Sequence, residues 1–188
     1  MLSHPLDAQR LTRFNSQLLD QALALAAAHE SPEQRPFAAV VGPHLRHVIE
    51  HFEALLAPAE IGVVDYDRRP RDRAVERSPY IAARRIAALQ ARLAACAGMA
   101  SDAPLKVRQQ GGLEGEVDFE LDSSFGRELA FVASHAVHHF ALLKSHCAAN
   151  GIATDARFGQ APATLAHART TSSTPAFDKD PSCQDHFA

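Results

Sequence analysis

The chain has 188 residues, of which 46% are hydrophobic, and a formal net charge of −3. This length fits one domain with a hydrophobic core, and the charge gives no electrostatic case for binding nucleic acid or an anionic membrane. No run approaches the roughly 18 apolar residues that span a bilayer, and the N-terminal residues lack the apolar core of a secretory signal. Three widely spaced cysteines predict no disulfide framework, so a cytoplasmic location is expected.

Four segments show the apolar spacing of helices. The first covers residues 6–28 and the second covers about 37–57, with Pro43 inside it. Because proline cannot donate a backbone hydrogen bond, an extended or turn-like start is expected, with the regular helix beginning near Pro43. The third helix covers about 79–99. The fourth covers about 125–149 and is followed by an Asn-Gly pair that is typical of helix ends.

The connections between these helices differ in character. Residues 58–78 are a long polar crossover, whereas LKVRQQGGLEGEVDFELD alternates apolar and polar residues around glycines and predicts a short β-like excursion, a hairpin. The predicted fold class is therefore all-α: a four-helix bundle with a long crossover and this excursion before the last helix. The predicted bundle domain covers 1–165. Residues 166–188 are rich in Ser, Thr, Pro and Asp and predict a flexible tail.

Histidine is unusually frequent, and seven of the eleven histidines fall within the second and fourth predicted helices. His47 and His51 lie one turn apart on the second helix, and His135 and His139 lie one turn apart on the fourth. Two imidazoles at this spacing can bind one ion, and a histidine from a facing helix would complete a three-His site with an open coordination position. The ordinary alternative is a set of polar histidines on a partly solvated face.

The stretch SHAVHHF has the histidine spacing of the zinc protease motif HExxH, but it lacks the catalytic glutamate of that motif. Ala136 stands where the general base would be, so a protease of this class is excluded. His138 lies about 100° around the helix from His139 and is expected to face another helix or solvent.

Two motifs resemble the DinB-like (YfiT-related) metal-binding bundles. GPHLRHVIEHFEALL resembles the second-helix block of that family, and GRELAFVASHAVHHFALL resembles its last-helix HxxxH block. The N-terminal domains of ergothioneine-type sulfoxide synthases are similar. The likeness covers about residues 8–165, although many relatives carry a Trp-Ser before the second helix and this chain has no tryptophan.

The resemblance implies one metal ligand from the second helix and two from the fourth. These positions correspond to His47, His135 and His139. His51 is the main rival of His47 because it shares the same helical stripe, and His44 is the weaker rival because it lies closer to the start of the helix. The implied cofactor is a divalent ion, zinc or nickel first and iron third, since imidazole suits all of them.

The function implied by the resemblance is a metal-dependent enzyme acting on a small-molecule substrate. A hydrolase or a transferase that binds a low-molecular-weight thiol as thiolate fits an open three-His ion. The alternatives are a non-catalytic metal-binding or stress-related protein and a bundle whose histidines bind nothing. No individual catalytic residue is assigned. A homodimer is compatible with this class, because bundles with an exposed apolar helix face often pair.

Charged residues near the histidines have two interpretations. Glu50 and Glu128 could orient ligand histidines, or they could be surface carboxylates. The arginines of the crossover could clamp the carboxylates of an anionic substrate, or they could belong to a solvated loop paired with its own acids. These arginines are Arg68, Arg69, Arg71 and Arg73.

Overall fold

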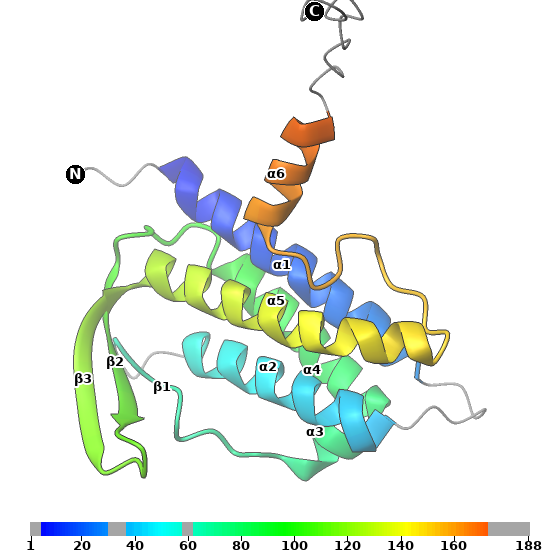
Figure 1. Ribbon diagram of the computed structural model, residues 1–188. Coiled ribbons are helices and arrows are strands. Elements are labelled where there is room, and N and C mark those ends of the chain that lie inside the picture. The colour runs from blue at the N-terminus through cyan, green and yellow to red at the C-terminus, as the bar shows by residue number, and fades with distance from the viewer. Residues whose placement is uncertain (1–4, 30–36, 58–61, 173–188) are drawn as a thin grey trace, which may run out of the picture.

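Four long helices enclose the core of the protein. The computed structural model describes residues 5–29, 37–57 and 62–172. The long helices are α1 (Pro5–Ala27), α2 (Gly42–Leu55), α4 (Pro79–Ala95) and α5 (Phe125–Ala149). Helix α1 packs against α4 and α5, and α2 packs against the same two helices (Figure 1). Each helix therefore buries its apolar stripe against two neighbours.

All four helices lie where the apolar spacing predicts them. Of the two expected starts of the second helix, the structure has the turn: Phe37–Val41 form a π-helical turn, η1, and the regular helix begins at Gly42, next to Pro43. A side chain at Gly42 would collide with the backbone of Glu76, because its Cβ would lie 1.8 Å from that carbonyl oxygen. The glycine therefore permits close packing of α2 against the crossover.

The expectation of an all-α fold class is wrong, because the chain also forms a three-stranded mixed sheet. Its strands are β1 (Val63–Asp65), β2 (Pro104–Gly111) and β3 (Val117–Ser124), in the order β1-β2-β3. Strand β1 is parallel to β2, with Val64 opposite Val107, and β2 is antiparallel to β3. The predicted hairpin is β2–β3, and Gly112 and Gly115 have the positive φ values of its turn.

The crossover between α2 and α4 has more structure than its polar sequence predicts. It contributes β1 to the sheet and then a short helix, α3 (Arg73–Arg77). The side chain of Asp72 caps α3 by accepting a hydrogen bond from the backbone N–H of Ala74 at 2.8 Å. Ser78 caps α4 in the same way. From residue 62 onward, the crossover is therefore ordered by a strand and a capped helix.

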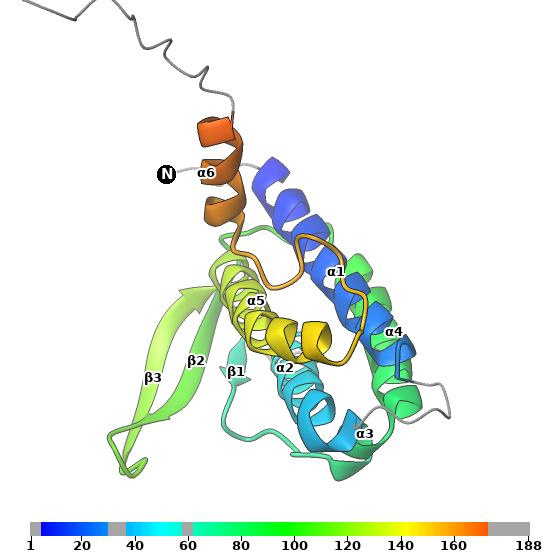
Figure 2. The same cartoon turned by 45° about the vertical axis from the view of Figure 1, so that its right-hand side comes forward.

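The C-terminal part also differs from the sequence-based expectation. Helix α6 (Pro162–Ser172) includes the first residues of the predicted tail, and residues 173–188 lie outside the described part of the chain. Figure 2 shows α6 projecting beyond the end of α1. The division at residue 165 remains a prediction. Among the helices that the structure describes, none is long and apolar enough to cross a membrane.

The different burial of two neighbouring leucines on α5 makes a direct test of the fold possible. Leu143 on α5 is 1% exposed, whereas its neighbour Leu142 is 53% exposed. Leu143→Ala is expected to lower the free energy of unfolding by about 2–5 kcal/mol, because it leaves a cavity. Leu142→Ala removes the same atoms from the surface and should change the free energy of unfolding by less than about 0.5 kcal/mol. Urea unfolding of both variants measures the difference, and equal losses would contradict this arrangement of α5.

Candidate metal centre

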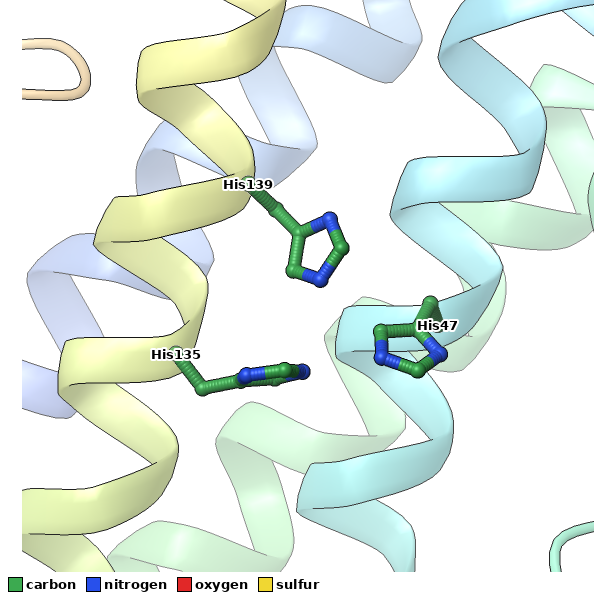
Figure 3. A group of neighbouring side chains, drawn as sticks. All are labelled: His47, His135 and His139. Atoms are coloured by element: carbon green, nitrogen blue, oxygen red, sulfur yellow. The ribbon is translucent and has the colours of Figure 1, made fainter. Parts of the chain in front are cut away.

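Three histidines from two helices meet in the space between α2 and α5. His47 comes from α2, His135 and His139 come from α5, and one nitrogen of each lies within 4.8 Å of the others. Figure 3 shows the three rings directed toward one another across the gap between the helices. The helical spacing explains the α5 pair, because residues four apart lie on one face. The structure thus brings together the three residues that the sequence motifs single out.

The spacing of these nitrogens is close to what an ion requires. Nitrogens bound to a tetrahedral zinc ion at about 2.0–2.1 Å lie about 3.4 Å apart. The three nitrogens, within 4.8 Å of one another, would need to move together by roughly 1 Å. Side-chain rotation alone can supply a movement of this size. The donor set is also suitable, since imidazole binds zinc, nickel and iron.

Hydrogen bonds engage one nitrogen of His139 and one of His47. His139 Nδ1 lies 2.8 Å from His44 Nδ1, so that one of these nitrogens donates to the other. His47 Nδ1 lies 2.7 Å from Arg69 Nη1. His135 Nε2 is buried and has no hydrogen-bond partner among the described residues. A buried nitrogen without a partner is costly, and a metal ion would satisfy it.

His44 is therefore placed to orient a ligand histidine rather than to bind the ion. If His139 Nδ1 carries the proton and donates it to His44, His139 Nε2 keeps the lone pair that a metal needs. Hydrogen bonds of this kind fix the tautomer and the ring orientation of metal-binding histidines. Sequence reasoning considered His44 only as a weaker ligand.

His51, the main rival of His47, lies beside the three histidines. Its Nδ1 donates to the carbonyl oxygen of His47 at 2.7 Å, and its ring centroid lies 4.2 Å from that of His135. It is buried and stacks on Tyr66, with ring centroids 5.4 Å apart. The donated proton leaves the lone pair on His51 Nε2, so this ring has the tautomer of a ligand although it lies outside the group of three.

Aromatic packing supports the α5 histidines from one side. Phe131, one turn before His135, stacks on that ring with centroids 5.8 Å apart and planes at 19°. Tyr66 packs on Phe131 at 5.1 Å. The sequence reasoning did not single out Phe131, although its spacing of four residues from His135 could have indicated the contact.

Burial keeps the imidazoles neutral. The pKa of His47 is lowered to about 3, and the pKa values of His51, His135 and His139 are lowered to about 4. Desolvation is the largest cause, and the charges of neighbouring histidines and of Arg69 contribute to the lowering. Because only a neutral imidazole binds a metal, the cluster is ready for coordination at neutral pH without losing protons.

The carboxylates that could orient ligand histidines are engaged elsewhere. Glu50 is buried and accepts a hydrogen bond from the backbone N–H of Asp72 at 2.8 Å. Glu128 is fully buried and accepts hydrogen bonds from Tyr66 at 2.7 Å, Ser123 at 2.5 Å and Arg127 at 2.6 Å. Within the described residues, neither carboxylate forms a hydrogen bond with His47, His135 or His139. Their role is to hold the crossover and the sheet against α2 and α5.

Of the four crossover arginines, one reaches the histidines. Arg69 donates through Nε to the carbonyl oxygen of Tyr66, and its Nη1 faces His47. Arg68 is turned away because the backbone N–H groups of Asp67 and Arg68 both donate to the side chain of Asp65 at 3.0 Å. Arg71 and Arg73 are exposed. Of the arginines that could clamp an anionic substrate, Arg69 is the one that faces the histidines.

Comparison with known proteins gives little beyond this geometry. No family model matches the chain, and no solved structure matches it. A segment of 107 residues, 57% of the chain, is 33% identical to "FK506-binding protein 5" of Rhizopus delemar. The match spans 28% of that protein's own length, so the name of the whole protein assigns no activity to this chain.

The lowered histidine pKa values predict how the stability of the metal-free protein depends on pH. In the unfolded chain these histidines titrate near 6.5, so the unfolded state takes up protons first as the pH falls toward about 4. The free energy of unfolding should therefore fall between about pH 6.5 and about pH 4. His135→Gln removes one such group and should make the decline shallower.

Urea unfolding across this range measures the effect. The matched control is His138→Gln, since His138 is exposed on the same helix. This variant should keep the wild-type slope. A wild-type stability that does not change between about pH 7 and about pH 4 would contradict the neutral cluster.

Proposed function

We propose that the protein binds a divalent metal ion, zinc or nickel before iron, through His47, His135 and His139. The observation that carries the proposal is the buried, unpartnered Nε2 of His135 in a group of three converging imidazoles. Three ligands leave a coordination position open for water or a small molecule, as in catalytic metal sites. The two histidine motifs, one on α2 and one on α5, also support membership of the DinB-like class.

The surroundings of the site favour ligand binding over hydrolysis. A hydrolase needs a base beside the metal-bound water, and the nearby Glu50 and Glu128 are both held by other donors. An ion that binds a thiol needs no such base at neutral pH, because coordination itself lowers the pKa of the thiol. We therefore place a low-molecular-weight thiol transferase ahead of a hydrolase, with non-catalytic metal binding as the alternative. Within the part of the chain that the structure describes, Cys96 and Cys147 form no disulfide, which is consistent with a reducing cytoplasm.

Metal binding is tested with purified protein that is stripped of metal and then titrated with zinc or nickel. Wild type should bind one equivalent. Changes to residues that support metal ligands typically weaken metal binding by about 10–100-fold. His47→Ala and His139→Ala should each weaken metal binding by more than this. His51→Ala should weaken binding less than His47→Ala, and His138→Ala should have no effect.

Competition with a chromophoric chelator gives the affinities, and elemental analysis gives the stoichiometry. A wild type that binds no metal would remove the proposal. A larger loss in His51→Ala than in His47→Ala would move the α2 ligand to His51. The affinity should also fall as the pH drops toward about 4, where protons begin to compete for the imidazoles.

Catalysis is tested separately from binding. Metal-loaded protein is assayed with a panel of low-molecular-weight thiols and an electrophilic acceptor, and the loss of free thiol is followed. Wild type should exceed His139→Ala, because the ion that holds the thiolate is missing from the variant. Equal rates for the two proteins would leave metal binding without catalysis.

A further inference from the structure

Arg69 is a charged side chain that forms no ion pair with the residues that the structure describes. Within the described residues, no carboxylate lies at ion-pair distance from it, whereas nearby Arg46 pairs with Glu76 at 2.9 Å and Arg85 pairs with Asp72 at 2.9 Å. Arg69 is partly buried. A guanidinium that is partly withdrawn from water is stabilised by an anion, and the described part of this protein supplies none in contact with it.

The two carboxylates that influence Arg69 most act from a distance. Glu50 and Asp67 favour its charged form but form no ion pair with it. Each is engaged by a backbone N–H, Glu50 by that of Asp72 at 2.8 Å and Asp67 by that of Gln110 at 2.7 Å. Within the described residues, the Arg69 guanidinium is therefore left without a carboxylate partner.

The guanidinium is held at the edge of the three-His group. Its Nε donates to the carbonyl oxygen of Tyr66, and the hydroxyl of Tyr66 donates to the buried Glu128 at 2.7 Å. Its Nη1 lies 2.7 Å from His47 Nδ1. Arginine has five N–H donors in a fixed plane, which match the two oxygens of a carboxylate.

Metal binding would change the partner of this guanidinium. A neutral His47 that gives its Nε2 lone pair to an ion carries its proton on Nδ1. That nitrogen can then no longer accept a hydrogen bond from Arg69, because both groups are donors. His51 Nδ1, at 3.2 Å from Arg69 Nη1, cannot accept either, since it already donates to the carbonyl oxygen of His47. Loading the site would thus leave Arg69 with an unsatisfied donor at the edge of the three-His group.

We propose that Arg69 is the anion-binding residue of the metal centre, and that the centre binds small molecules that carry both a carboxylate and a metal-coordinating group such as a thiolate. The inference rests on the proposed metal site and adds the class of its ligand. Such a thiol would bind as thiolate after releasing its proton to solvent, and its carboxylate would accept hydrogen bonds from Arg69.

Cobalt-loaded protein tests the proposal, because a thiolate bound to cobalt gives a near-ultraviolet charge-transfer band. Mercaptoacetate, which has a carboxylate, is titrated against 2-mercaptoethanol, which has none. Wild type should prefer mercaptoacetate. In Arg69→Gln this preference should shrink by about tenfold, the effect of about 1.4 kcal/mol. Arg69→Lys keeps the positive charge but loses the planar arrangement of donors. Its preference for mercaptoacetate should lie between those of wild type and Arg69→Gln.

The matched control is Arg68→Gln, in the same loop. Arg68 has an 87% exposed side chain and pairs with Asp65 at 3.6 Å, so its removal should leave the preference unchanged. A wild type that binds both thiols equally would overturn the inference whatever the variants do. An unchanged preference in Arg69→Gln would also overturn it, because chelation by the metal alone would then explain the selectivity. Failure of wild type to bind cobalt would instead remove the metal site itself.

Discussion

The packing of α2 against α5 withdraws a set of imidazole rings from water, and the rest of the site depends on this withdrawal. Desolvation lowers the pKa values of His44, His47, His51, His135 and His139. A neutral buried ring must still satisfy two nitrogens, one as a donor and one as an acceptor. Outer partners take up one nitrogen of several rings, namely His44, Arg69 and the carbonyl oxygen of His47. One nitrogen of each of His47, His135 and His139 lies close to the others, and these three nitrogens form the candidate metal centre.

The sequence predicts the parts of this arrangement that depend on local spacing. Apolar periodicity locates the four long helices, and i,i+4 spacing pairs His135 with His139 because both features arise within a single helix. Strand β1 has three residues and pairs with β2, whose partner residues lie more than forty positions later, so no local periodicity could reveal it. The all-α expectation fails for this reason. Helix α6 was missed because its Ser- and Thr-containing sequence resembles a tail.

The roles of individual polar residues depend on rotamers and loop conformation, which the sequence does not give. His44 and His51 share a helical face with His47, yet one contacts His139 and the other donates to the backbone. Arg68 and Arg69 are adjacent, but a turn around Asp65 directs the first outward and leaves the second facing the histidines. Glu50 and Glu128 have the spacing of orienting residues but hold the crossover and the sheet instead.

The hairpin is joined to the centre through the crossover. Strand β2 pairs with β1 immediately before Tyr66, and the backbone of Gln110 holds the side chain of Asp67. The loop that carries Arg69 is thus mounted on the sheet, whereas the imidazoles are mounted on the helices. Changes in the length or sequence of β2–β3 can therefore move the Arg69 guanidinium while leaving every histidine in place. In such an architecture the position of the guanidinium and the position of the imidazoles can change independently of each other.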